Sequence, residues 1–122
     1  MTEYLEPPQA VAAAEHLGFR IRDRGLLFSA IGRPAASMFG EDAYPSIEMK
    51  AAVLLESLAR DHPLFDGNKR FSWYLALAYL RINGLRLVMP EDEAFDLILG
   101  VAQGSIDPEA SAAAIAARLA AR

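Results

Sequence analysis

The sequence lacks cysteine altogether, and its 122 residues include only two lysines and two histidines. Without cysteine the chain can form neither a disulfide framework nor a thiolate metal site. It also lacks the uninterrupted apolar run of about 18 residues that marks a membrane-spanning helix. Its first residues, MTEYLEPPQ, show no basic and then apolar export signal. We therefore expect a cytoplasmic protein that does not enter a membrane.

Positive charge is also scarce, because 12 basic residues stand against 16 acidic ones and the net charge is −4. A protein that binds nucleic acid through its phosphates needs a basic face, so direct nucleic-acid binding is not favoured. Apolar residues, in contrast, make up 53% of the chain, beside 23% charged residues. This balance and the length predict one folded domain over residues 1–122.

Apolar residues recur at helical spacing along most of the chain, and proline, glycine and capping residues separate the repeats. We expect about six helices, with Asp23 and Ser46 as N-terminal caps of the second and third. The expected ranges are 9–18, 24–31, 46–61, 68–83, 91–102 and 108 onward. No sheet is expected, so the predicted fold class is an all-α bundle.

Four segments carry more particular expectations. The helix over 68–83 is apolar nearly all round, which predicts the most buried helix, with Trp73, Tyr74 and Tyr79 mainly in the core. Arg33–Pro45 contains two prolines and a glycine without a clean period, and we interpret it as a loop or flap. In the acidic cluster over 91–96, we interpret Glu91, Asp92 and Glu93 as charges that complement a helix start rather than as metal ligands. The alanine-rich end, ASAAAIAARLAAR, is interpreted as a solvated or capping helix.

The rarest polar residues gather in one stretch, HPLFDGNKR, at positions 62–70. Pro63 disfavours helical backbone at the residue before it, so one helix ends near His62 and the next begins near Asn68. Asn68 can either hold the loop or donate to a ligand. The first N–H groups of a helix lack internal partners and carry positive dipole charge. The stretch therefore predicts an anion site, and phosphate is a common occupant of such sites.

The residue types in this stretch suit a phosphorylated ligand. Gly67 lets a ligand approach the backbone, because it has no Cβ. Lys69 and Arg70 oppose the helix dipole and need a compensating anion, from a protein carboxylate or a ligand phosphate. Asp66 suits Mg²⁺, which takes one or two carboxylates together with phosphate oxygens and water. A neutral His62 could accept a proton from a hydroxyl nucleophile. Together they favour transfer of a phosphorus-containing group from a nucleotide.

A structural interpretation of the same stretch is also open. Asp-Gly is a common turn, and a histidine before proline can simply end a helix. Neither G-x-x-x-x-G-K-[ST] nor G-x-G-x-x-G is present, so the two familiar nucleotide loops are excluded.

The stretch resembles the signature loop of the Fic/Doc family, H-P-F-x-[DE]-G-N-[GK]-R, at eight of nine positions. Leu64 replaces the usual Phe. Lys69 and Trp73 stand where the adenylylating Fic branch has a glycine and a second arginine, as they do in the death-on-curing (Doc) toxins. The segments RDRGLLFSAIGRP, FGEDAYP and LRINGLRL are also similar to Doc sequences. The similarity therefore covers nearly the whole chain.

This resemblance implies the Fic/Doc fold, a compact bundle of about six helices with the loop between two central ones. It implies a toxin that moves the γ-phosphate of ATP, with Mg²⁺, to a threonine of elongation factor Tu and so arrests translation. By position, His62 would activate the target hydroxyl, Asp66 would bind Mg²⁺, and Arg33–Pro45 would form the flap where the target lies. The residues that would hold the ATP phosphates are Gly67, Asn68, Lys69 and Arg70.

Two other functions remain open, namely adenylyl transfer to a protein hydroxyl and a non-catalytic role as binding or regulatory partner of an antitoxin. The self-inhibitory motif of many Fic enzymes, [ST]-x-x-x-E-[GN], is missing, since Thr2–Pro7 and Ser37–Asp42 both fail at the last position. The resemblance therefore implies inhibition in trans, by a Phd-like antitoxin that inserts a C-terminal helix into a groove beside the active site.

Overall fold

Two helices begin at the N-cap residues that the sequence predicted. In the computed structural model, which describes residues 1–121, Asp23 Oδ1 accepts a hydrogen bond from the Leu26 N–H at 3.0 Å. Ser46 Oγ accepts one from the Met49 N–H at 3.1 Å. The α-helices within these residues are α1 (Pro7–His16), α2 (Arg24–Gly32), α3 (Ile47–Asp61), α4 (Asn68–Ile82), α5 (Glu91–Gln103) and α6 (Pro108–Ala116). They confirm the predicted all-α bundle of about six helices.

Short pieces of other structure complete the described chain. They are the 3₁₀ helix η1 (Arg33–Ala35) and the strands β1 (Ser37–Met38), β2 (Glu41–Asp42), β3 (Leu85–Leu87) and β4 (Leu119–Ala121). Strand β1 pairs antiparallel with β2, and β3 with β4, so residues 1–121 contain two small sheets that the sequence did not predict. Within the same residues, no helix has the length and apolar character needed to cross a bilayer.

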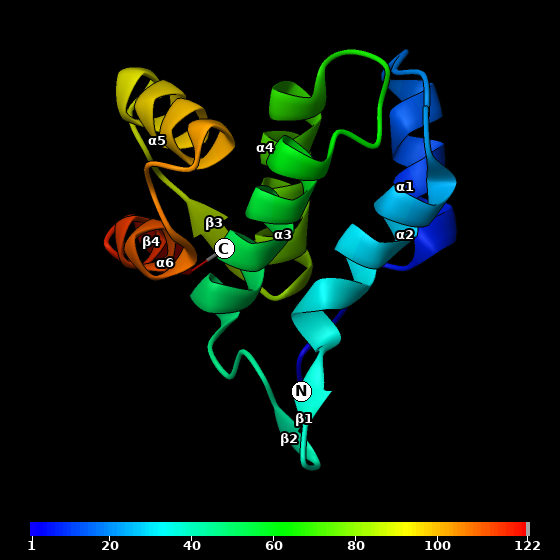
Figure 1. Cartoon of the computed structure of the whole chain (residues 1–122). Coiled ribbons are helices and arrows are strands. Elements are labelled where there is room, and N and C mark those ends of the chain that lie inside the picture. The colour runs from blue at the N-terminus through cyan, green and yellow to red at the C-terminus, as the bar shows by residue number, and fades with distance from the viewer. Residues whose placement is uncertain (122) are drawn as a thin grey trace.

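Helix α3 lies at the centre of the fold, with α1 and α2 on one side and α5 and α6 on the other (Figure 1). Nine of its residues are buried, against six in α4. The expectation that the helix over 68–83 is the most buried is therefore wrong. Helix α4 packs along α3 but turns Trp73 and Tyr74 toward a surface groove, whereas α3 is covered by α4, α5 and α6.

The segment interpreted as a flap lies at the opposite end of α3 from the loop that joins α3 to α4 (Figure 1). Its residues form η1 and the β1–β2 hairpin, and the 15 residues of α3 separate the two ends by about 22 Å. None of these residues lines the cavity over that loop, and a role for Arg33–Pro45 in holding a target stays a prediction. Buried Lys50 holds this segment at the start of α3. Its Nζ donates to Asp42 Oδ2 at 3.1 Å and to the carbonyls of Pro34 and Tyr44.

The alanine-rich end changes conformation partway along. Helix α6 ends at Ala116, and residues 119–121 form β4 against β3, with Leu119 opposite Leu87. The expectation of a helix through the whole tail is therefore wrong for residues 119–121, and Arg122 lies outside the described residues. Main-chain groups of β3 provide pairing partners for the tail, and this tertiary pairing overrides the helix propensity of alanine.

The start of the chain is tied to the same region. Asn83, which follows α4, accepts a hydrogen bond from the Glu3 N–H at 2.8 Å through Oδ1. Its Nδ2 donates to the Glu3 carbonyl at 3.0 Å. Both the N-terminal segment and β4 are therefore fastened to the few residues that follow α4.

Candidate active site

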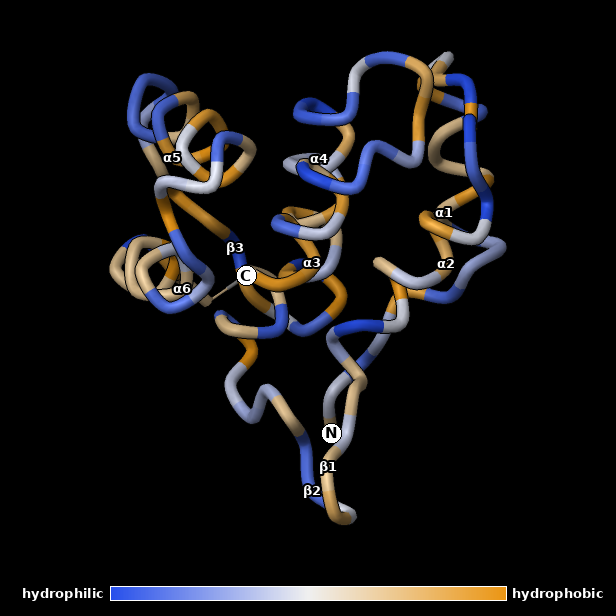
Figure 2. The backbone as a smooth tube through the Cα atoms, viewed as in Figure 1, coloured by the Kyte–Doolittle hydropathy of each residue, from blue (hydrophilic) through white to orange (hydrophobic). Residues whose placement is uncertain are grey.

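The HPLFDGNKR loop joins α3 to α4 and carries hydrophilic residues on both sides of a hydrophobic pair (Figure 2). The pair is Leu64, which is 1% exposed, and Phe65, which is exposed. Leu64 also forms an isolated antiparallel bridge with Ile21. Leucine at this position therefore anchors the loop in the core, as the usual Phe is expected to do.

His62 ends α3 in an uncommon backbone conformation. Its φ of 55° and ψ of 60° lie in the left-handed region, which residues with a Cβ seldom adopt. Pro63 disfavours the right-handed helical region at His62, so the helix has to stop here. The His62 side chain stays exposed and lines the cavity described below.

Asn68 closes the loop with its side-chain amide. Its Oδ1 accepts from the Leu64 N–H at 2.9 Å, and its Nδ2 donates to the Leu64 carbonyl at 3.1 Å. Of the two roles left open for this side chain, holding the loop is the one that the structure supports. What Asn68 can still offer a ligand is its backbone N–H in the first turn of α4.

The α1–α2 connector (residues 17–23) runs alongside the loop and supports its backbone. The Phe65 N–H donates to the Arg20 carbonyl at 3.0 Å. The N–H groups of Arg22 and Asp23 donate to the Pro63 carbonyl at 2.7 and 3.0 Å. The loop is therefore held by main-chain hydrogen bonds to a segment some 40 positions earlier in the sequence.

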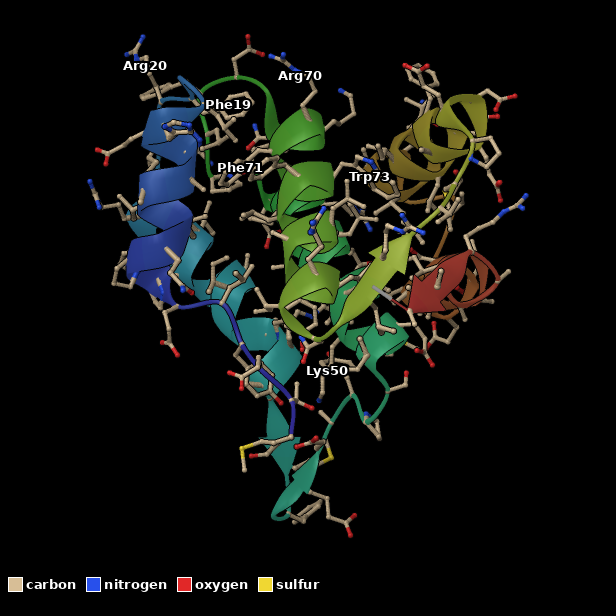
Figure 3. All side chains as sticks on the ribbon, turned by 180° about the vertical axis from the view of Figure 1, so that it is seen from behind. Phe19, Arg20, Lys50, Arg70, Phe71 and Trp73 are labelled. Carbon is tan, nitrogen blue, oxygen red and sulfur yellow. The ribbon has the colours of Figure 1, made fainter. Side chains whose placement is uncertain are left out.

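Phe19, from the same connector, lies against the glycine of the loop. Figure 3 shows its side chain near those of Arg70 and Phe71. Gly67 has a φ of 82°, and a Cβ there would lie 2.2 Å from Phe19 Cε1, so both backbone and space require glycine. The Phe19 ring also meets Phe71 at an angle, with centroids 5.5 Å apart. The Arg70 guanidinium lies 5.3 Å from the Phe19 centroid. Phe19 therefore packs against both the glycine turn and a site cation.

A cavity of about 600 Å³ opens over the loop. All six residues predicted for the site line it, namely His62, Asp66, Gly67, Asn68, Lys69 and Arg70. The other lining residues are Ala59, Phe65, Leu99, Ala102 and Gln103. The structure thus brings the predicted residues together in a hollow of the size that small-molecule sites have.

The cations of the cavity have no carboxylate partner in the part of the chain that the structure describes. The ion pairs found there are Arg33–Glu56, Lys50–Asp42 and Arg118–Glu93. Lys69 and Arg70 lie in the first turn of α4, where no described side chain caps the helix. Their charges add to the positive end of the helix dipole. Of the two compensating anions considered from the sequence, no described carboxylate lies within ion-pair distance of either cation, which favours a ligand anion.

The donor set of the cavity suits a magnesium ion held largely by ligand oxygens. Asp66 provides the carboxylate, and its Oδ1 accepts from the Gly67 N–H at 2.9 Å. Across residues 1–121, no three histidine, cysteine, aspartate or glutamate residues group together as a metal site would require. One carboxylate completed by phosphate and water oxygens is a usual arrangement for Mg²⁺.

An apolar groove of about 370 Å³ adjoins the cavity between α4 and α5. It is lined by Lys69, Arg70, Trp73, Tyr74, Leu77, Phe95, Ile98 and Leu99. Lys69 and Arg70 border both hollows. The expectation of core packing is confirmed for Tyr79, which is 1% exposed, and for half-buried Trp73, which packs against the core and also lines the groove. It is wrong for Tyr74, which is exposed on the groove wall.

The sequence reasoning missed the residues that support the loop from outside it. Phe19, Arg20 and Arg22 fall between the expected helices 9–18 and 24–31, and the sequence predicts no role for them, although FRIR alternates apolar and polar residues as an extended segment does. That alternation, between two helices, was the available signal. The wall contributed by α5, which includes Gln103, had no comparable signal, because it depends on how α5 packs.

Comparisons with known proteins give independent information on this chain. The model of the Fic/DOC family matches residues 4–80, which include both the loop and the connector. The chain is 44% identical over 122 residues to Toxin Doc of Mycolicibacterium smegmatis (strain ATCC 700084 / mc(2)155), covering 95% of this chain and 93% of that protein. It is 37% identical over 84 residues to Protein kinase doc of Escherichia phage P1, covering 69% of this chain and 65% of that protein. The chain therefore belongs to the Fic/Doc family, in its Doc branch.

Proposed function

We propose that this chain is the toxin of a toxin–antitoxin pair and an ATP-dependent protein kinase. The observation that carries the proposal is the positive charge of one cavity, where Lys69, Arg70 and the uncapped start of α4 meet no carboxylate partner within the described residues. Such an arrangement suits the phosphates of a nucleotide. The name of the phage P1 relative, Protein kinase doc, adds support for phosphoryl transfer.

His62 acts in this proposal as the general base. Its imidazole lines the same cavity as the two cations. The hydroxyl of the target gives its proton to the neutral imidazole while its oxygen bonds to the γ-phosphorus of ATP. The bond between the γ-phosphorus and the β–γ bridging oxygen breaks, and ADP leaves with that bonding electron pair. The imidazolium then releases the proton to solvent.

The phosphates of ATP lie, in this proposal, across the start of α4. The backbone N–H groups of Asn68 and Lys69 and the side chains of Lys69 and Arg70 bind the phosphate oxygens. Gly67 contributes by leaving space, since its own N–H donates to Asp66. Asp66 would hold Mg²⁺, which when bound neutralises charge on the phosphates.

The proposed target is a threonine of elongation factor Tu, whose phosphorylation would arrest translation. The proposed regulator is a Phd-like antitoxin. The apolar groove between α4 and α5 has Trp73 and Phe95 among its lining residues and adjoins the cavity. An amphipathic helix that lays its apolar face in such a groove is a common mode of recognition. Bound there, it would lie beside the site cations.

Labelled ATP tests the reaction. We expect purified chain, elongation factor Tu, Mg²⁺ and ATP labelled on the γ-phosphate to yield labelled threonine, and ATP labelled on the α-phosphate to yield none. Transfer of the α-label would overturn the kinase proposal in favour of adenylyl transfer. Absence of transfer from either ATP, with an active target preparation, would favour the non-catalytic role.

The two histidines provide a matched pair of variants. His62→Ala is expected to reduce transfer by about 10²–10⁴-fold, since that is the usual effect of losing a general base, and to relieve growth arrest in cells. His16→Ala removes an exposed histidine of α1 and should leave both unchanged. Full toxicity of the His62 variant would reject the enzymatic proposal.

A further inference from the structure

The carbonyl oxygen of His62 is held by a side chain from the α1–α2 connector. The Arg22 guanidinium donates to this oxygen through Nε at 2.9 Å and also through Nη2. Nη2 lies 3.4 Å from the carbonyl oxygen of Asp61 as well. Arg22 therefore occupies the C-terminal end of α3, where the last carbonyls lack helical partners.

The backbone of the same residue holds the next carbonyl along the loop. The Arg22 N–H donates to the Pro63 carbonyl at 2.7 Å. Two consecutive carbonyls, those of His62 and Pro63, thus receive donors from one residue. Fixing both carbonyls sets the orientation of the two peptide planes, and with it the direction of the Cα–Cβ bond of His62.

His62 depends on such support for two reasons. Its left-handed backbone, with φ 55°, is one that glycine usually supplies at a helix end. Its imidazole, moreover, has no hydrogen-bond partner among residues 1–121, so no described side chain holds the ring by a hydrogen bond. Histidine bases are commonly oriented by a third group that contacts the ring, and here the contact is made to the main chain instead.

We propose that Arg22 is a positioning residue for His62, acting through the His62 carbonyl to direct the imidazole into the cavity. The proposal rests on the function proposed above for His62. Within the described chain Arg22 is not among the residues that line the cavity. Displacing a reacting group by about 1 Å can cost about 10²-fold in rate. The contribution of Arg22 should therefore be seen in kcat and not in ATP binding.

A plain capping role for Arg22 would have different consequences. A cation at a helix C-terminus stabilises the helix by binding the last carbonyls. Removing it would then lower the melting temperature without changing how the folded molecules react. The tests below measure quantities that capping alone does not change.

Kinetics with three variants separate these roles. Arg22→Ala is expected to lower kcat about 10–100-fold and to change the dissociation constant for ATP with Mg²⁺ by less than about twofold. Arg22→Lys keeps a donor but not the planar fork, so it should recover part of kcat. Arg24→Ala is the matched control, because this exposed arginine has no side-chain partner among residues 1–121. All assays run below the melting temperature of the weakest variant.

NMR of the histidine rings gives a readout that is independent of catalysis. His16 and His62 are the two histidines of the chain, so His16 serves as an internal reference in every spectrum. Arg22→Ala should shift or broaden the His62 ring signals and leave those of His16 in place. Arg22→Lys should move the His62 signals back toward those of the parent protein. Adding Arg22→Ala to His62→Ala should change the residual rate by less than about twofold.

The outcomes distinguish this proposal from the one it rests on. If His62→Ala abolishes transfer while Arg22→Ala leaves kcat and the His62 signals unchanged, the role of Arg22 is rejected and the proposed function stands. The same rejection follows if Arg22→Ala raises KM or lowers the melting temperature with kcat unchanged. If His62→Ala retains full transfer, the proposed function fails, whatever Arg22 does.

Discussion

The two ends of helix α3 use the chain's two lysines in opposite ways. At the N-terminal end, Lys50 is fully buried and pairs with Asp42 at 3.1 Å. Beyond the C-terminal end, Lys69 and Asp66 are both exposed, and neither forms an ion pair within residues 1–121. A buried ammonium must find acceptors in the protein, whereas an exposed one stays hydrated until a ligand replaces the water. The hairpin end is therefore structural, and the loop end is available for binding.

Gly67 offers the most severe way to damage the loop end. Gly67→Ala should lower the free energy of unfolding by about 2–4 kcal/mol, because the alanine needs a left-handed backbone and its Cβ meets the Phe19 ring. Gly84→Ala is the control, since Gly84 has a similar φ of 78° and nothing within 4 Å of the added Cβ. It should cost about 1 kcal/mol. Equal losses in urea unfolding would show that the Phe19 contact contributes nothing.

Lys50→Met tests the hairpin end. The substitution keeps most of the volume but leaves the carbonyls of Pro34 and Tyr44 without this donor. We expect the free energy of unfolding to fall by about 2–3 kcal/mol, measured by urea denaturation. The kcat of the folded variant should match the parent, since the loop lies at the other end of α3. A large loss of kcat would mean that the two ends are coupled.

Lys69→Met tests the loop end, where we expect a loss of ATP binding rather than of stability. The variant should bind ATP with Mg²⁺ about tenfold more weakly, equivalent to about 1.4 kcal/mol, as measured by calorimetry. Its stability should stay within about 0.5 kcal/mol of the parent, because the lost cation opposed the dipole of α4. If the two lysine variants lost equal stability, the contrast between the ends of α3 would be wrong.

Tyr79→Phe is expected to have the smallest effect, at the hairpin end. The Tyr79 hydroxyl is buried, without a hydrogen-bond partner in the described residues, so its removal at neutral pH should change stability by less than about 1 kcal/mol, or raise it. Burial raises the pKa of Tyr79, with smaller contributions from Tyr4 and Asp42. The unfolded chain, whose tyrosine pKa is about 10, then loses this proton first.

The sign of the pH dependence follows from that difference. The contribution of Tyr79 is fully present below about pH 10 and is lost as the pH rises further. The melting temperature should therefore fall less between neutral pH and a pH above 10 in Tyr79→Phe than it does in the parent. Tyr74→Phe, at an exposed tyrosine, is the control and should keep the parent's alkaline loss. An unchanged alkaline loss in Tyr79→Phe would contradict the assignment.

Features encoded by neighbouring residues could be predicted from the sequence. Asp23 and Ser46 cap helices within three positions of themselves, and both were identified. The six candidate site residues lie within nine consecutive positions, so their common cavity follows from a loop between two helices. The arginine that holds His62, in contrast, lies 40 positions away, and its role depends on how α1 and α2 pack.

Contacts between distant segments explain the features that the sequence did not predict. Nothing in the residues around Lys50 indicates that this lysine is buried against the hairpin while Lys69 is exposed. Residues 119–121 are leucine and alanine, which favour helix, yet β3 pairs them as a strand. In each case the deciding partner is distant in the sequence, so the local pattern carries no information about it.

The tie of both chain ends to the residues after α4 has a mechanical consequence. Glu3 is held by Asn83, and β4 is held by β3 at Leu85–Leu87. A load applied between the two ends, as when an unfolding motor draws on one of them, passes through this junction of a few residues. The loop lies about 22 Å away at the other end of α4. It stays outside the path of the force until the junction separates.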